Sequence, residues 1–278
     1  MKLEMENKIS LLAFDLDGTL LDSTGDISRA TLARIHKAME RGIRVTISSG
    51  RTPPMQQVFV SLLGFRGPYI ACNGALILDS RDNSVLHSRP LENAELARLC
   101  EFSRQERFHI CIQNRDALYY SKGNPRVSLL QQYNGVASKH GFPEVPIRFI
   151  EDDPGILARP AYKVLIYTPE PKQHQRLAAY LNKCSGLAYT FSEPNLFEIS
   201  PPGVTKGEGI ELICRHYKIP LGEVCAFGDY DNDIPIFERV GTGIAMGNAC
   251  AALKSVAALV TDTNDNDGIG KALAAMGI

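Results

Sequence analysis

The sequence has almost no net charge. Its 30 basic and 31 acidic residues leave a formal charge of -1 at pH 7. A protein that binds a nucleic-acid backbone or an anionic membrane usually carries a basic surplus, because it has to neutralise many phosphates. The sequence therefore predicts no nucleic-acid partner and no membrane partner. An anionic ligand would have to be bound by a local group of residues.

Paired cysteines and long apolar runs are also missing. The seven cysteines stand singly, and no C-x-x-C pair suggests a zinc site or a redox couple. No run approaches the ~18 apolar residues of a membrane-spanning helix. The apolar run 9–14 is too short for a signal peptide. We therefore expect mostly buried thiols and a cytoplasmic location.

What the sequence does contain is an ordinary globular composition with a repeating order of elements. With 278 residues, 44% of them hydrophobic, the chain is long enough for about two domains. Strand-like runs alternate with helical segments near both ends. The predicted strands are 9–14, 43–47, 69–72, 224–227, 243–246 and 258–261. This alternation is typical of an α/β fold with a doubly wound, mostly parallel, Rossmann-like sheet that contains both ends of the chain.

The middle of the chain follows a different pattern. Helices are predicted over 93–107, from 126 onward and over 172–183, with strand-like segments at 108–113, 117–120 and 162–168. This mixture predicts an α+β domain inserted into the first one. We place the inserted domain at 84–196 and the core at 1–83 and 197–278.

The segment Asp15-Leu16-Asp17-Gly18-Thr19 directly follows the first predicted strand. Ligands of open α/β sheets usually bind at the carboxyl ends of the strands. Two carboxylates one residue apart can point the same way, and together they would repel a phosphate unless a cation lay between them. Mg²⁺ prefers carboxylate, water and phosphate oxygens. The segment thus predicts a magnesium site that receives a phosphate, and the ordinary alternative is an acidic turn.

Three other polar segments fit the same chemistry. Ser49 and Gly50 follow the second strand and can donate hydrogen bonds to a phosphate near a helix N-terminus. Lys206 begins a late helix, where its charge could neutralise a phosphoryl group. Residues 228–233 place three acids and an amide after a strand, without the flanking helices and final glutamate of an EF-hand. Taken singly, each segment is also compatible with an ordinary turn or a solvated surface.

Together these segments resemble the haloacid dehalogenase superfamily, specifically the Cof-type phosphatases with a large inserted cap of the C2B type. The resemblance spans essentially the whole chain. Its motifs appear in order at 15–19, 49–51, 206–207 and 228–233, with further similar stretches at 73–75, 198–207, 245–249 and 267–269. Tyr230-Asp231 departs from the pattern, since relatives more often have a smaller residue and a glutamate there.

The resemblance implies a Mg²⁺-dependent phosphatase that hydrolyses small phosphorylated metabolites through an aspartyl-phosphate intermediate. Asp15 would be the nucleophile and a metal ligand. Asp17 would be the general acid and base and would bind Mg²⁺ through its backbone carbonyl. Asp229 would be the third protein ligand, supported by Asp233. The implied phosphate-binding residues are Leu16 through its backbone N–H, Ser49, Gly50, Lys206 and Asn232.

Two other functions stay open at this point. A phosphomutase of the same superfamily would also use Asp15 and Asp17 but would return the phosphoryl group to a sugar. A non-catalytic regulatory protein that binds a phosphorylated ligand would keep the phosphate-binding residues, but it would need neither a nucleophile nor an acid. The sequence identifies neither the physiological substrate nor the oligomeric state.

The inserted domain, by the same resemblance, would cover the site and select the leaving group of the substrate. Tyr119, Tyr120 and Arg126 are candidates for substrate contact, with no role assigned to any one of them. His87, His109, His140 and His174 have no metal-ligand spacing.

Overall fold

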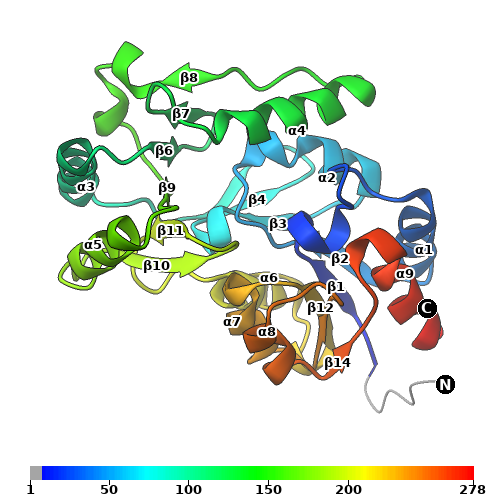
Figure 1. Cartoon of the computed structure of the whole chain (residues 1–278). Helices are drawn as coiled ribbons and strands as arrows, with labels where there is room; N and C mark the ends of the chain where they lie inside the picture. The colour runs from blue at the N-terminus through cyan, green and yellow to red at the C-terminus, as the bar shows by residue number, and fades with distance from the viewer. Residues whose placement is uncertain (1–7) are drawn as a thin grey trace.

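A computed structural model describes residues 8–278 of the protein. Its main sheet has five parallel strands in the order β14-β13-β12-β1-β2, so that strands from the two ends of the chain lie side by side (Figure 1). The strands are β1 (Leu11–Phe14), β2 (Arg44–Ile47), β12 (Val224–Gly228), β13 (Thr242–Ala245) and β14 (Leu259–Val260). The predicted α/β class with a parallel core sheet is confirmed.

The unbroken apolar run of β1 is explained by helices on both faces of the sheet. Leu12 and Phe14 belong to a buried cluster with residues of one set of helices, and Leu11 and Ala13 belong to a cluster with the other set. The first set comprises α1 (Arg29–Glu40), α2 (Gln57–Leu63) and α9 (Gly268–Ala275); the second comprises α6 (Lys206–Tyr217), α7 (Ile234–Phe237) and α8 (Ala251–Val256). Successive side chains of a strand point to opposite faces, so every position of β1 is buried.

The third predicted strand does not continue the parallel pattern. It forms an antiparallel three-stranded sheet, made of β3 (Pro68–Ala71), β4 (Leu76–Asp79) and β5 (Val85–Ser88). A parallel bridge between Ser48 and Ile70 connects it to the end of β2. The chain reverses after β3 because Asn73 and Gly74 both have positive φ, and this turn brings β4 back alongside β3. The strand expected at 69–72 is therefore present, but it forms its ladder with β4 and joins the main sheet through this bridge.

The inserted region contains a second sheet of six strands in the order β10-β11-β9-β6-β7-β8. The strands are β6 (Ile110–Gln113), β7 (Leu118–Tyr120), β8 (Arg148–Phe149), β9 (Lys163–Tyr167), β10 (Ala188–Phe191) and β11 (Leu196–Ser200). Three helices accompany it, α3 (Asn93–Glu106), α4 (Val127–Lys139) and α5 (Pro171–Leu181). Helices α3 and α5 lie away from the main sheet, whereas α4 lies above α2 (Figure 1).

The two faces of the inserted sheet pack against different parts of the molecule. Along β6, Ile110 and Ile112 belong to a cluster with α3 and α5, and Cys111 belongs to a cluster with α4 and the core. Tyr133 of α4 makes the same connection, since its hydroxyl donates a hydrogen bond to the carbonyl of Pro54 at 2.7 Å. One face of the inserted sheet is therefore turned toward the core of the molecule.

Strand pairing suggests slightly different domain boundaries from those predicted. Residues 85–88, assigned to the inserted domain, form β5 and pair with β4 of the core. Residues 197–200, assigned to the core, belong to β11 and pair with β9 and β10. An apolar strand looks the same in sequence whichever sheet buries it. We therefore propose that the inserted domain comprises residues 89–200.

Two other expectations concern the cysteine thiols, expected to be mostly buried, and membrane-spanning helices, of which none was expected. All seven cysteines are free, and Cys72, Cys111, Cys214 and Cys225 are buried. Burial raises the pKa of Cys72 and of Cys111 to about 12, so both thiols are protonated near neutral pH. Between residues 8 and 278, no helix combines the length and the apolar character needed to cross a bilayer.

The loop after β3 contacts the start of α6 closely. Gly74 has a φ of +104°, and a Cβ atom at this position would lie 2.4 Å from the carbonyl oxygen of Thr205. The Thr205 hydroxyl accepts a hydrogen bond from the Glu208 N–H at 3.1 Å and so caps α6. Glycine at position 74 lets the loop pack against the helix end that carries Lys206.

We expect Gly74→Ala to lower the free energy of unfolding by more than Gly42→Ala does. Both glycines have positive φ, which costs an alanine roughly 1–2 kcal/mol. Only at position 74 does the new methyl group meet backbone atoms, because nothing lies within 4 Å of a Cβ at Gly42. Urea denaturation of the two variants measures the difference. Equal losses would contradict the contact with Thr205.

Candidate active site

Three neighbouring strands of the main sheet end at the same level. Phe14 of β1 is in register with Ile47 of β2 and with Phe227 of β12. Because the strands are parallel, the residues that follow them emerge together at the carboxyl edge of the sheet. Asp15 follows β1, and Asp229 follows β12. Two acids separated by more than two hundred residues of chain thus meet at one place.

Lys206 connects two of the acids at this edge. Its side chain is fully buried, and its ammonium donates hydrogen bonds to Asp15 Oδ1 at 2.6 Å and to Asp233 Oδ1 at 2.7 Å. Burial on its own would lower the pKa of Lys206, but the two carboxylates outweigh it and raise that pKa above its ordinary value. Lys206 is therefore charged, and it stabilises the carboxylates in turn.

Asp15, Asp229 and Asp233 form a compact carboxylate group, with one oxygen from each within 4.8 Å of the others. Asp233 uses both of its oxygens within the protein. Its Oδ1 accepts from Lys206, and its Oδ2 accepts from the backbone N–H groups of Asp229 and Tyr230 at 3.0 and 3.3 Å. This arrangement favours the predicted supporting role of Asp233.

Crowding shifts the titration of these carboxyl groups. Burial raises the pKa of Asp15 to about 7; Asp233 and Asp17 add to the rise, and Lys206 opposes it. Burial, together with Asp15 and Asp233, raises the pKa of Asp229 to about 9. The repulsion falls if a cation binds among the acids. The donor set is made of carboxylate oxygens, which suits Mg²⁺, and the residues present therefore fit the ion.

The turn that follows β1 is packed against Asp229. Gly18 has a φ of +72°, and a Cβ there would lie 2.3 Å from Asp229 Oδ2. Thr19 Oγ1 donates a hydrogen bond to Asp229 Oδ1 at 3.3 Å, and Asn248 donates to the carbonyl oxygen of Gly18 at 2.8 Å. The glycine of the D-x-D-G-T segment is thus required by the approach of a third acid as well as by the bend.

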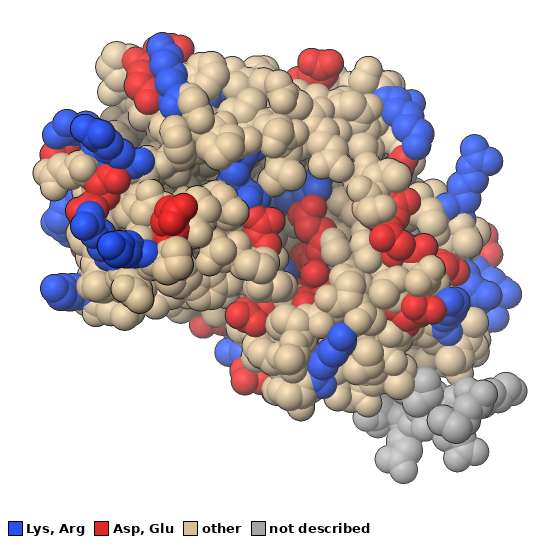
Figure 2. All heavy atoms as spheres, viewed as in Figure 1, with Lys and Arg blue, Asp and Glu red and all other residues tan. Residues whose placement is uncertain are grey.

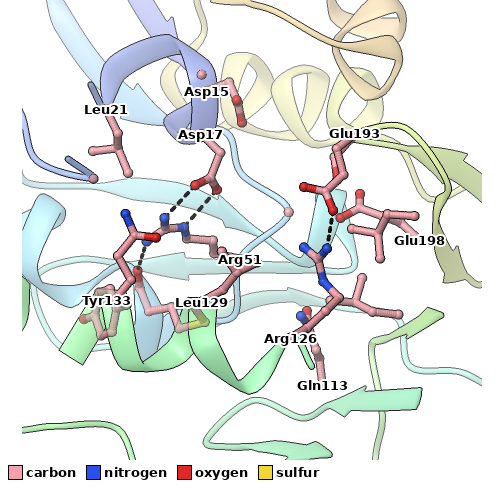
Figure 3. Close-up of a pocket in the computed structure, with 18 of the residues that line it drawn as sticks. Asp15, Asp17, Leu21, Arg51, Gln113, Arg126, Leu129, Tyr133, Glu193 and Glu198 are labelled. Carbon is pink, nitrogen blue, oxygen red and sulfur yellow. Dashed lines mark hydrogen bonds and ion pairs between the residues drawn. The ribbon is translucent and has the colours of Figure 1, made fainter. Parts of the chain in front are cut away.

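Asp17 forms a bidentate ion pair with Arg51 (Figure 3). Arg51 Nη2 donates to Asp17 Oδ1 at 2.6 Å, and Nε donates to Oδ2 at 2.9 Å. The guanidinium also lies near the rings of Phe59 and Tyr133. The Asp17 side chain is largely exposed, with 63% of its surface accessible, and the charge and hydrogen bonds of Arg51 hold its pKa below its ordinary value. The sequence offered Arg51 as part of a motif but gave it no role.

The predicted phosphate-binding residues surround this edge of the sheet. Gly50 and Asn232 line the cavity above the acids, whereas Leu16, Ser49 and Lys206 are buried beside it. The Ser49 hydroxyl oxygen accepts a hydrogen bond from the Arg51 N–H at 3.1 Å. Its own O–H proton has no acceptor within residues 8–278, so Ser49 can still donate to a ligand.

The cavity has a volume of about 230 Å³ and lies between the core and the inserted region. Figure 2 shows acidic and basic side chains gathered in a hollow at this place. The core contributes Asp15, Asp17, Gly50, Asp229 and Asn232 to its wall, together with Arg51. The inserted region contributes a polar group, which consists of Gln113, Arg126, Lys163, Glu193 and Glu198, and an apolar group on α4, which consists of Leu129, Tyr133 and Val136.

Of the three residues expected to contact the substrate, two line the cavity and one does not. Tyr120 and Arg126 line the cavity, and Arg126 forms an ion pair with Glu193 (Figure 3). Tyr119 lies elsewhere, and its hydroxyl accepts a hydrogen bond from Arg159 at 2.6 Å. Sequence reasoning missed Lys163 entirely, since a single lysine at the start of an apolar strand carries no signal.

The parallel sheet, the acids at its carboxyl edge and the inserted sheet over the cavity define an α/β enzyme with a site suited to a divalent cation. Residues 12–273 match the family described as haloacid dehalogenase-like hydrolase. The chain belongs to this family, and the resemblance found in the sequence is confirmed.

Known relatives align with nearly the full length of the chain. The 5-amino-6-(5-phospho-D-ribitylamino)uracil phosphatase YitU of Bacillus subtilis is 28% identical over 277 residues that cover 97% of this chain and 98% of the relative. Phosphatase YwpJ of the same organism is 27% identical, with 94% and 97% covered. The crystal structure of a haloacid dehalogenase-like hydrolase from Bacteroides thetaiotaomicron has a TM-score of 0.82 at 26% identity, with 96% and 99% covered.

We expect Arg51→Met to raise the pKa of the Asp17 carboxyl group, because Arg51 supplies the charge and both hydrogen bonds that lower it. An NMR titration of carboxyl carbons in ¹³C-aspartate-labelled protein measures the change. Arg104→Met is the control: it removes an exposed ion pair with Glu101 on α3 and leaves the titration of Asp17 unaltered. An unchanged Asp17 titration in Arg51→Met would show that Arg51 does not govern this group.

Proposed function

We propose that the protein is a Mg²⁺-dependent phosphatase of small phosphorylated metabolites and that Asp15 forms an aspartyl-phosphate intermediate. The observation that carries the proposal is the buried contact of Lys206 with Asp15 at 2.6 Å, within a group of carboxylates at the end of β1. A carboxylate beside a fixed cation is held in place to attack, and the cation can offset the charge of an incoming phosphoryl group.

Asp15 has one oxygen free for chemistry. Lys206 donates to Oδ1, and within residues 8–278 Oδ2 accepts no hydrogen bond. In the first step an Asp15 oxygen bonds to phosphorus, and the bond from phosphorus to the ester oxygen of the substrate breaks. In the second step water attacks the phosphoryl group, the bond to Asp15 breaks, and inorganic phosphate and the free carboxylate are formed.

Asp15, Asp229 and the backbone carbonyl of Asp17 would hold the Mg²⁺, whose charge would keep the carboxylates ionised and lower the repulsion of the phosphate. Lys206, Ser49, Gly50, Asn232 and the Leu16 N–H would bind the phosphoryl oxygens, with Asp233 holding Lys206.

Asp17 is the group placed to move protons. Its carboxylate is ionised near neutral pH, and only the ionised form can take a proton from water in the second step. As an acid in the first step, Asp17 has to give a proton to the leaving oxygen. Both of its oxygens accept hydrogen bonds from Arg51, so this ion pair has to loosen before Asp17 can be protonated. Arg51 would thus position Asp17 and set the balance between its two roles.

The cavity supports a small substrate. A volume of about 230 Å³ admits a metabolite and excludes a folded macromolecule. Two relatives bear the name phosphatase, and the name of one of them gives a phosphomonoester of a ribityl compound as its substrate. These names support hydrolysis of a phosphomonoester as the reaction, and the identity of the substrate within this class stays open.

An assay with 4-nitrophenyl phosphate tests the proposal. We expect turnover with Mg²⁺, none in the presence of EDTA, and a loss of roughly 10⁴-fold or more in kcat for Asp15→Asn, because an amide cannot accept the phosphoryl group. Asp231→Asn is the matched control: it changes an acid of the 228–233 loop that is not in the predicted ligand set, and we expect wild-type turnover.

Two results would overturn this proposal. One is full turnover in rigorously metal-free buffer. The other is wild-type kcat in Asp15→Asn, with deamidation excluded by mass spectrometry.

Asp17→Asn separates the two proton transfers. An aryl phosphate has a good leaving group, so the variant should still phosphorylate Asp15 but release phosphate slowly. We expect a burst of phenol equal to the enzyme concentration, followed by a slow steady rate. With an alkyl phosphate we expect the first step itself to slow by about 10²- to 10⁴-fold. Rapid-quench kinetics measure both, and equal proportional losses in the first step would contradict the acid role.

A further inference from the structure

Lys163 is a buried cation in the cavity wall that the mechanism above does not use. It is the first residue of β9, and its side chain is only 2% exposed. Its ammonium donates a hydrogen bond to Glu198 Oε1 at 2.7 Å, and Glu198 lies on the neighbouring strand β11 with 4% of its side chain exposed. An ammonium group has three N–H donors. Glu198 is the single hydrogen-bond partner of the Lys163 ammonium within residues 8–278.

Strand register explains why this pair faces the active site. Lys163 is paired with Gln113 on β6, and Glu198 is paired with Leu165 on β9. All four residues line the cavity, so they belong to the face of the inserted sheet that is turned toward the core. Like Leu165, other residues of that face are apolar, and Leu118 and Leu196 also line the cavity. A buried ion pair there costs desolvation energy that an apolar pair would not.

The ammonium of Lys163 lies directly against the predicted phosphate site. A Cβ atom at Gly50 would be 2.8 Å from Lys163 Nζ and 3.2 Å from Glu198 Oε1. Gly50 is one of the residues whose backbone N–H is proposed to bind a phosphoryl oxygen.

Glu198 is held on its other side by the core. Asn73 Nδ2, in the loop after β3, donates to Glu198 Oε2 at 2.5 Å. Asn73 Oδ1 in turn accepts from Asn232 Nδ2 at 3.4 Å, and Asn232 is a proposed phosphate-binding residue. Hydrogen bonds thus run from the inserted sheet to the phosphate-binding loop of the core. Asn73 would donate its hydrogen bond to any oxygen acceptor at position 198, charged or neutral. This contact therefore does not explain why a lysine is buried beside Glu198.

We propose that Lys163 is a second phosphate-binding lysine, supplied by the inserted region and held in place by Glu198 and Asn73. Resting on the proposed function, this places the phosphoryl group between Lys206 on the core side and Lys163 on the opposite side. The free N–H groups of Lys163 donate to the phosphoryl oxygens. Phosphate binding then depends on the closeness of the inserted sheet to Gly50.

Direct binding of inorganic phosphate, measured by calorimetry in the presence of Mg²⁺, tests this role without turnover. Lys163→Met alone would leave Glu198 buried and unpaired, so the double variant Lys163→Met/Glu198→Gln is used, which removes both charges. We expect it to bind phosphate about 10- to 100-fold more weakly than wild type, as the loss of a charge-assisted hydrogen bond predicts. Lys122→Met, which changes an exposed lysine of the inserted region, is the control and binds as wild type does.

Glu198→Gln alone has the opposite expected effect. It leaves the positive charge of Lys163 without its partner, so phosphate should bind more tightly than in wild type. A purely structural ion pair predicts the reverse order: weaker binding in Glu198→Gln and recovery in the double variant, where no buried charge is left unpaired. If thermal unfolding shows that the double variant is not folded, the test depends on the Glu198→Gln variant alone. Phosphate binding by Glu198→Gln that is unchanged or weaker than in wild type then overturns the proposal.

The remaining outcomes separate this proposal from the proposed function. Phosphate binding within threefold of wild type in the folded double variant overturns the role of Lys163 and leaves the phosphatase proposal standing. A wild-type protein that neither binds phosphate nor hydrolyses 4-nitrophenyl phosphate overturns both.

Discussion

The buried contact of Lys206 with Asp15 and Asp233 is the interaction on which the rest of the site depends. None of these groups can keep its charge in the interior alone, and removing one partner of a buried ion pair typically costs about 3–5 kcal/mol. Their meeting requires the end of β1, the loop after β12 and the start of α6 to be in place together. The same contacts that complete the core sheet therefore assemble the acids, so fold and site are coupled.

Charges in the cavity wall occur in pairs. Asp17 is paired with Arg51, Glu193 with Arg126, and Glu198 with Lys163. Such pairs surround a bound ligand with fixed dipoles instead of mobile water. Fixed dipoles need little reorganisation free energy when charge develops during a reaction. The carboxylates around Asp15 are the exception, because three acids share one lysine there. That surplus of negative charge is the physical reason why we propose a divalent cation at this point and not elsewhere in the cavity.

The elements that were predicted well carry their own local signal. The apolar run of β1, the helix that begins at Lys206 and the D-x-D-G-T segment each have a local cause, so sequence reasoning could find them. The strand β3 was predicted at the right residues, but its pairing with β4 could not be predicted because it depends on the turn at Asn73 and Gly74. The boundary that we propose after β11 differs from the predicted one for a similar reason: a largely buried strand of five residues would suit either sheet.

The sequence by itself determined the fold class, the family and the acids at the ends of the strands, because these depend on residue type and on spacing along the chain. Only the tertiary structure decided that Arg51 binds Asp17 and that the Lys163 ammonium lies against Gly50. Both contacts join segments that are far apart in the chain, and the second joins the inserted sheet to the loop after β2. The face of a strand that is turned toward a site depends on register and on the packing of the whole molecule. The sequence alone does not indicate on which face a lysine in an apolar strand lies.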